Sequence, residues 1–169
     1  MGVTRRQWFF RGIIVMMILV VIVRQYMKYK IAPELELQTI ELVSLAGQPI
    51  DISTEFAGKN ILLTAFATWC GPCHAEVAGM EAARPTLEQA GFVLIHISDE
   101  EVGKIQGFIN KNPSGITYLR TTVLLEKIGV HTYPTHFLFD KNGALRYKQT
   151  DPFDWSDPQV ITGLIKQVD

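Results

Sequence analysis

The stretch Asn60–Cys73, NILLTAFATWCGPC, joins a buried-strand pattern directly to two cysteines. Residues 60–68 are almost continuously apolar, which is typical of a central strand covered on both faces. Pro72 suits the first turn of a helix, where its missing N–H costs nothing, and apolar residues recur after it. We therefore predict a buried strand, a tight turn at Cys70 and a helix over about 72–89.

The chain has only two cysteines, Cys70 and Cys73, and they lie three positions apart. A disulfide scaffold would use more cysteines at wider spacing, and a structural zinc site would need further ligands. At a helix N-terminus, unpaired N–H groups and the helix dipole stabilise a thiolate. We therefore predict a redox pair in which Cys70 is the exposed attacking thiolate and Cys73, one turn further in, resolves the mixed disulfide.

The rest of the soluble part predicts alternating strands and helices. Strands are expected over 35–43, 60–68, 92–97, 116–119, 136–140 and 145–149, and helices over 72–89, 98–112, 122–128 and 157–168. Ile50 and Ile52 are expected to continue an N-terminal hairpin, and Asn142-Gly143 predicts a second one. This order predicts an α/β fold with a mixed central sheet and helices on both faces.

Two of the predicted helices begin with capping signals. Ser98-Asp99-Glu100-Glu101 matches a capping box, in which side chains at both ends of the first turn satisfy free N–H groups. Asp157 precedes Pro158 and predicts the N-cap of the last helix.

Residues 1–33 have the composition of a membrane-inserting segment. They carry six Lys or Arg and no acidic residue, and Ile13–Val23 is unbroken apolar sequence. A helix from Trp8 to Tyr29 would be about 33 Å long, enough to cross a bilayer. We therefore predict an uncleaved single-pass anchor with a basic linker over 1–33, followed by one soluble domain over 34–169.

Alternatives remain open for this segment. One is a cleaved secretory signal, although the best cleavage site, after Ala32, has Lys30 where a small residue is preferred. Thr4–Phe9 resembles a twin-arginine export signal, and an ordinary basic leader is the other interpretation. The apolar run has three Lys or Arg on each side, so this count does not fix its orientation.

The soluble part is acidic. Residues 34–169 carry ten Lys or Arg against seventeen Asp or Glu, a net charge of −7. A nucleic-acid-binding protein needs a basic face, so this balance argues against that class of function.

The motif Trp69-Cys70-Gly71-Pro72-Cys73 resembles the active site of the thioredoxin superfamily letter for letter, and the likeness extends from about Leu35 to Asp169. The longer stretch Phe66–Glu76 looks most like the TlpA/ResA branch of membrane-anchored bacterial thiol–disulfide oxidoreductases. This resemblance implies a thioredoxin-like fold with an N-terminal β-hairpin. It also implies a catalytic domain on the extracytoplasmic, periplasmic side of the cell membrane.

The resemblance also implies roles for residues outside the cysteine motif. Pro134 matches the superfamily's cis proline beside the disulfide, and Trp69, Tyr133 and Thr135 are expected to bind substrate. Glu76 matches a glutamate that lies near the cysteines in this branch, where a carboxylate can accept and return the proton of Cys73. A solvated surface position is the alternative for Glu76. Thioredoxins carry a buried aspartate where this chain has Thr64, which favours Glu76 as the proton relay.

The predicted function is therefore reduction of disulfides in cell-envelope proteins, with cytochrome c maturation as one candidate pathway. Dithiol exchange needs no cofactor and no metal, but a membrane electron donor of the DsbD/CcdA kind must recharge the cysteines. The alternative from another class is a copper-binding carrier, in which His131 or His136 would join the two cysteines. His74 completes a haem c attachment string but is expected on the exposed first turn of the helix, and His96 is expected to be structural.

Overall fold

The computed structural model describes residues 5–30 and 32–168, and the chain divides into two compact units, Met1–Ile31 and Ala32–Asp169. The first unit is a single helix, α1 (Arg5–Lys30). Its segment Phe10–Met27 has a mean hydropathy of 1.8 and is long and apolar enough to cross a membrane, a test that a signal sequence passes as well. Thr4 and the side chains of Arg5 and Arg6, which belong to the twin-arginine-like motif, lie outside the described part of the chain.

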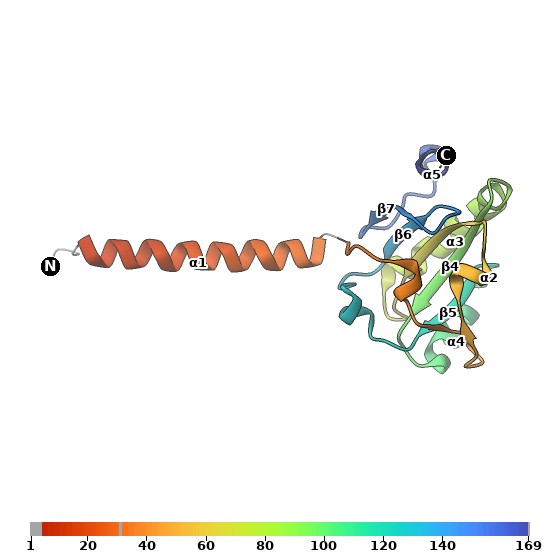
Figure 1. Cartoon of the computed structure of the whole chain (residues 1–169), viewed down its shortest axis with the longest axis horizontal. Coiled ribbons are helices and arrows are strands. Elements are labelled where there is room, and N and C mark those ends of the chain that lie inside the picture. The colour runs from red at the N-terminus through yellow and green to blue at the C-terminus, as the bar shows by residue number, and fades with distance from the viewer. Residues whose placement is uncertain (1–4, 31, 169) are drawn as a thin grey trace. The chain divides into compact units, whose positions relative to one another are not determined.

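Within residues 32–168, seven strands form one mixed sheet in the order β2-β1-β5-β4-β3-β6-β7 (Figure 1). The strands are β1 (Leu42–Val43), β2 (Pro49–Ile50), β3 (Asn60–Ala65), β4 (Phe92–Ser98), β5 (Thr117–Thr121), β6 (Thr135–Phe139) and β7 (Leu145–Gln149). The pairs β3/β4 and β4/β5 are parallel, whereas β1/β2, β1/β5, β3/β6 and β6/β7 are antiparallel. The central strand β3 is buried on both faces, as its continuous apolar run predicts.

Helices cover both faces of the sheet, as predicted. They are α2 (Ile52–Glu55), α3 (Gly71–Gln89), α4 (Val102–Lys111) and α5 (Pro158–Val168), with the 3-10 helices η1 (Leu37–Thr39) and η2 (Leu125–Ile128). One apolar cluster joins β3 and β4 to side chains of α3, α4 and α5. A second cluster joins the other face of the sheet to η1, α2 and η2.

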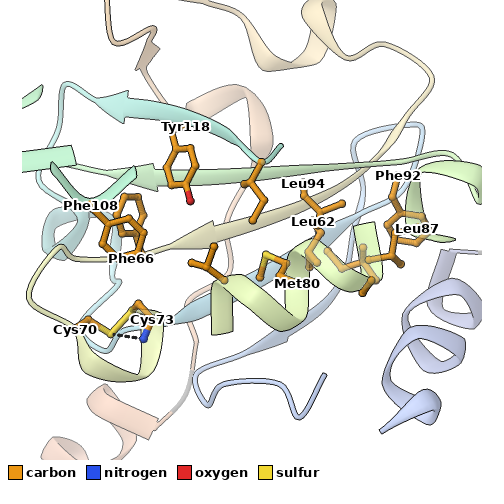
Figure 2. Close-up of a cluster of buried hydrophobic side chains, with 14 of the residues drawn as sticks. Leu62, Phe66, Cys70, Cys73, Met80, Leu87, Phe92, Leu94, Phe108 and Tyr118 are labelled. Carbon is orange, nitrogen blue, oxygen red and sulfur yellow. Dashed lines mark hydrogen bonds between the residues drawn. A yellow bond between two sulfur atoms is a disulfide. The ribbon is translucent and has the colours of Figure 1, made fainter. Parts of the chain in front are cut away.

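The first cluster positions the cysteines. Figure 2 shows Cys70 and Cys73 at one end of it, Met80 in the middle, and Leu87 with Phe92 at the far end. Met80 and Leu87 are completely buried, so α3 is anchored to the sheet along its length. Since each buried side chain of this size contributes about 1.5–3 kcal/mol, the N-terminus of α3 is held firmly against the strand that precedes it.

The predicted strand over 35–43 is wrong over most of its length. The backbone turns into η1, where the Thr39 N–H and hydroxyl both donate to the Glu36 carbonyl oxygen, and only Leu42–Val43 pairs in the sheet. Ile52 does not continue the hairpin either, because Asp51 caps α2 by accepting the Ser53 N–H at 3.0 Å.

The predicted capping box at residues 98–101 is also wrong. Glu101 is the N-cap of α4 and makes no side-chain capping bond. The Glu100 carboxylate instead binds Thr68, and the Asp99 carboxylate accepts the Leu125 N–H at 2.8 Å. The two carboxylates thus hold neighbouring loops together. The cap at Asp157 is confirmed, since its carboxylate accepts the Gln159 N–H at 2.9 Å.

Candidate active site

Cys70 and Cys73 form a disulfide at the N-terminus of α3, with their Cα atoms 5.3 Å apart. Cys70 is the N-cap residue, and its sulfur lies 3.2 Å from the Cys73 N–H, the contact drawn dashed in Figure 2. The Cys73 N–H at this helix end therefore points at the sulfur of Cys70, an arrangement that stabilises a thiolate once the pair is reduced.

The predicted exposure of Cys70 is wrong for the disulfide form. Cys70 is 4% exposed and Cys73 3%, and both belong to the apolar cluster that contains Phe66. The S–S bond ties the helix tip to this cluster, so little of either sulfur faces solvent in the oxidised protein.

Aromatic and extended segments flank the disulfide. Trp69 is 74% exposed, and its ring meets the ring of Tyr133 edge-on with 5.8 Å between centroids. Tyr133 packs on the cluster that contains both cysteines, and the Tyr133–Pro134 peptide bond is cis. Burial, reinforced by the negative charges of nearby carboxylates, raises the pKa of Tyr133 to about 12, so its hydroxyl stays protonated. The exposed ring of Trp69 thus lies against Tyr133, the residue before the cis proline.

The side chain of Thr135 is turned inward, and its backbone pairs with β3. It is 1% exposed, its hydroxyl donates to the Thr132 carbonyl oxygen at 2.6 Å, and its backbone is in register with Ala65 of β3. The side chain of Thr135 is therefore engaged inside the fold, at the residue where β6 begins.

The loop before Cys70 is fixed at Thr68. The Glu100 carboxylate accepts both the N–H and the hydroxyl of Thr68. The Thr68 carbonyl oxygen lies 3.0 Å from Nε2 of His74, and Nδ1 of His74 lies 2.8 Å from the side-chain nitrogen of Asn112. The prediction of an exposed His74 is wrong, because the imidazole is half-buried and stacks against Phe108 at 4.3 Å.

Glu76 is buried, so the solvated alternative is wrong. It is 5% exposed, and its Oε1 accepts the Phe153 N–H at 2.7 Å and the Trp155 indole N–H at 3.0 Å. Its Oε2 is buried without a hydrogen-bond partner among the described residues. Glu76 follows Cys73 by three residues on α3, so the two side chains share one face of the helix.

A row of polar side chains crosses the sheet beneath α3. His96 on β4, Thr64 on β3 and His136 on β6 stand opposite one another in the strand register. Nδ1 of His136 lies 3.0 Å from the Thr64 hydroxyl, and its Nε2 lies 3.3 Å from Oε1 of Glu76. Nε2 of His96 lies 3.2 Å from the sulfur of Met80. Burial, with the nearby charge of His136 as a smaller cause, lowers the pKa of His96 to about 3, so this ring is neutral.

Sequence reasoning missed the segment that covers Glu76. Phe153 and Trp155 lie between β7 and α5, and a Cβ on Gly79 would come within 2.6 Å of the Cβ of Trp155. Together with Pro72 and Ala75, these residues line an open pocket of about 410 Å³ beside the first turns of α3. The only local signal was a pair of aromatic residues in an otherwise polar loop, which does not reveal a partner on α3.

The remaining candidate ligand, His131, pairs with Glu126, its Nδ1 4.0 Å from the carboxylate. In the described residues, no three His, Cys, Asp or Glu side chains gather closely enough to hold a metal ion.

Known proteins match both the sequence and the fold. ResA, a thiol-disulfide oxidoreductase of Geobacillus thermodenitrificans, is 30% identical over 121 residues, 69% of this chain and 62% of that protein. A secreted disulfide oxidoreductase of Mycobacterium tuberculosis, homologous to DsbE of E. coli, superposes with a TM-score of 0.61 at 20% identity, covering 79% of this chain and 98% of that one. A thioredoxin-family thiol:disulfide interchange protein of Chlorobium tepidum gives 0.58 at 23% identity, covering 80% and 98%.

These matches confirm the thioredoxin-like fold, while the chain spans less than two thirds of the length of the ResA protein it matches. The model of the AhpC/TSA family matches residues 29–148, a stretch that contains the cysteine motif, Glu76 and the cis proline. By this match over most of its length, the chain belongs to the AhpC/TSA family of thioredoxin-like proteins.

Proposed function

We propose that this protein is a membrane-anchored thiol–disulfide oxidoreductase that reduces disulfides in extracytoplasmic proteins. The observation that carries the proposal is the Cys70–Cys73 disulfide at the N-terminus of α3, in a domain with the cis Tyr133–Pro134 bond. The relatives named thiol-disulfide oxidoreductase support the same chemistry. Dithiol exchange of this kind needs no cofactor.

The reaction transfers two electrons from the reduced cysteine pair to a substrate disulfide. The Cys70 thiolate attacks one substrate sulfur, the substrate S–S bond breaks, and the other substrate sulfur leaves as a thiolate that takes up a proton. Cys73 then loses its proton and attacks the sulfur of Cys70, which displaces the second substrate thiolate. The substrate ends with two thiols, and the enzyme ends with the disulfide of this structure.

Glu76 is the proposed acceptor for the Cys73 proton. Its Oε2 is buried and unpartnered among the described residues, and it lies on the helix face that carries Cys73. A carboxylate in this position accelerates thiol deprotonation because the proton need not reach bulk water. The same group returns the proton when the pair is reduced again.

The proposed substrate surface lies beside the disulfide, around the exposed ring of Trp69. Trp69 offers apolar area, and the backbone at Tyr133, before the cis proline, offers groups with which a substrate strand can pair. Thr135 anchors this segment from beneath through its bond to Thr132. Proteins with an extended, exposed disulfide segment fit this surface better than small disulfides do.

The proposed electron donor and substrates follow from the proposed extracytoplasmic location. The envelope holds no reducing buffer, so a membrane dithiol donor of the DsbD/CcdA kind is the proposed source of electrons. Apocytochromes c carry their two haem-attachment cysteines in such a segment and are one candidate substrate class. The apolar stretch Phe10–Met27 is the proposed anchor.

The experiment that tests the activity is trapping with Cys73→Ser, which leaves Cys70 able to attack and removes the resolving sulfur. Full-length protein carrying this change should accumulate reducible mixed disulfides with envelope proteins. Cys70→Ser should give none and should abolish reduction of a model protein disulfide. Retained reduction by Cys70→Ser contradicts the mechanism, and tight stoichiometric Cu(I) binding without reductase activity identifies a copper carrier instead.

A second experiment tests the location. A reporter fused after Asp169 should be active only outside the cytoplasm, and the full-length chain should stay in the membrane fraction. A soluble product that begins near Pro33 shows a cleaved signal, and a reporter active in the cytoplasm contradicts the proposed orientation.

A further inference from the structure

We propose that His136 is a positioning residue for the proton step, so that Glu76 and His136 act as one pair when Cys73 loses its proton. This inference rests on the proposed function. It begins from an observation that the exchange chemistry alone does not explain. Two polar side chains, Glu76 at 5% exposure and His136 at 0%, lie in contact in the interior one helical turn from the redox cysteine.

The hydrogen bonds of Glu76 engage one carboxylate oxygen and leave the other without a partner among the described residues. Oε1 accepts from the Phe153 N–H and the Trp155 indole, and Nε2 of His136 approaches the same atom at 3.3 Å. Oε2 is buried and has no partner in the described structure. A carboxylate held by two N–H groups through one oxygen, with the His136 ring against the same atom, cannot rotate freely, so Oε2 is kept as the atom that receives a proton.

The ring of His136 is oriented by Thr64. A hydroxyl can donate to Nδ1, and the 3.0 Å separation of Thr64 Oγ1 from Nδ1 fits that bond. Nδ1 is then an acceptor, and the ring proton sits on Nε2, which faces Glu76. Thr64 therefore acts through His136.

The charge of His136 controls how well Glu76 accepts a proton. A cationic imidazole at 3.3 Å stabilises the ionised carboxylate and makes it a weaker base, whereas a neutral imidazole only orients it. The other titratable groups beside the pair are His96 on β4, which stays neutral, and Cys73 on α3. Phe153 and Trp155, which close the pair from above, carry no charge. The Cys73 step should therefore depend on the charge of the His136 ring as well as on the position of Glu76.

The test separates the two sulfur steps. Reduced full-length protein in detergent micelles is mixed with dithiobis(nitrobenzoate), a chromogenic disulfide that releases one coloured thiolate when Cys70 attacks and a second when Cys73 does. The rate of each release is measured across pH. Glu76→Gln should slow the second release by at least about tenfold, since positioned general bases contribute this much or more, and should not slow the first release.

His136→Gln keeps an N–H near Glu76 but cannot become cationic. We expect its second release to remain fast, with the inflection of its pH profile moved to higher pH, because a carboxylate that loses a cationic partner becomes a stronger base. His96→Gln is the matched control, because His96 stands in the same row but touches Met80 and not Glu76. Its profile should keep the wild-type inflection.

The outcomes distinguish the inference from the function on which it rests. If Glu76→Gln slows the second release while His136→Gln keeps the wild-type pH profile, the inference that Glu76 and His136 act together is wrong and the proposed function stands. If no second thiolate is released by the wild-type protein, the proposed function itself is wrong.

A second measurement does not depend on the folding of a His136 variant. The NMR titration of the His136 ring in wild-type protein is compared with that in Glu76→Gln. The midpoint should fall when the carboxylate is removed, because an adjacent negative charge favours the cationic ring. An unchanged midpoint overturns the pair.

Discussion

Nε2 of His74 lies 3.0 Å from the carbonyl oxygen of Thr68, across the turn that carries Cys70. Because the carbonyl is an acceptor, Nε2 is the donor, and Nδ1 accepts from the Asn112 amide at 2.8 Å. Both ring nitrogens are therefore used by a neutral imidazole. His74 therefore stabilises the turn. Although it directly follows Cys73, it does not act as a charged donor to the sulfurs.

The first prediction concerns the hydrogen bond between His74 and Thr68. His74→Ala should lower the free energy of unfolding of the oxidised protein by about 1 kcal/mol, the typical net value of one hydrogen bond, and should speed reduction of the disulfide by dithiothreitol. His74→Gln keeps a donor toward Thr68 and should retain most of the stability. Urea unfolding of the full-length protein in micelles measures the first effect, and equal losses in the two variants would show that the bond contributes nothing.

The second prediction compares two helical glycines. A Cβ at Gly79 on α3 would lie 2.6 Å from the Cβ of Trp155, whereas one at Gly103 on α4 meets nothing within 4 Å. Gly79→Ala should therefore cost about 1–3 kcal/mol through overpacking. Gly103→Ala should stabilise by about 0.5–1 kcal/mol, since alanine is the better helix former.

Gly79→Ala should also impair the proton step, because Trp155 donates to Glu76 and would be displaced. The second thiolate release is expected to slow in Gly79→Ala and to match the wild-type rate in Gly103→Ala. Similar stability and similar rates in both variants would contradict a role for the segment that covers Glu76.

The third prediction is a pH dependence of stability from His96. Burial lowers the pKa of His96 from 6.5 to about 3. At a pH between these two values, the imidazole is therefore protonated in the unfolded chain and neutral in the folded chain. Stability from this group is complete above about pH 6.5 and falls as the pH drops toward 3, by at most about 1.4 kcal/mol per unit. Urea midpoints at pH 7 and pH 4.5 should differ less in His96→Gln than in the wild type, and an equal difference would refute the assignment.

The sequence predicted the parts of the fold that depend on local pattern. The apolar run before Cys70, the proline in the next helical turn and Asp157 before Pro158 each specify their structure through neighbouring residues. The alternation over 35–43 misled because its apolar side chains are indeed buried, while the backbone between them turns into η1. Burial alone does not distinguish a strand from a short turn that covers the same sheet.

The contacts around the site depended on partners far apart in the chain. Glu100 lies within the sequence of the predicted capping box, and only the approach of Thr68, 32 residues away, decides its actual bond. Glu76 was predicted as a proton relay from the resemblance, but its donors at Phe153 and Trp155 lie 77 and 79 residues away. No periodicity connects such positions, so the buried pair with His136 emerges only from the folded structure.

The last prediction is the direction of electron flow, for which we expect reduction of substrates. A strong oxidant needs an unstable disulfide, and hence a strongly stabilised Cys70 thiolate in the reduced form. Here Gly71 and Pro72 separate the cysteines and supply no side-chain donor, and His74 is occupied with Thr68. The helix N-terminus alone stabilises the thiolate moderately, and an ionised Glu76 opposes it. Equilibration of the full-length protein with glutathione should therefore give a potential nearer the thioredoxin value of about −270 mV than the DsbA value of about −120 mV. A value near the latter would make the protein an oxidant and reverse the proposed direction.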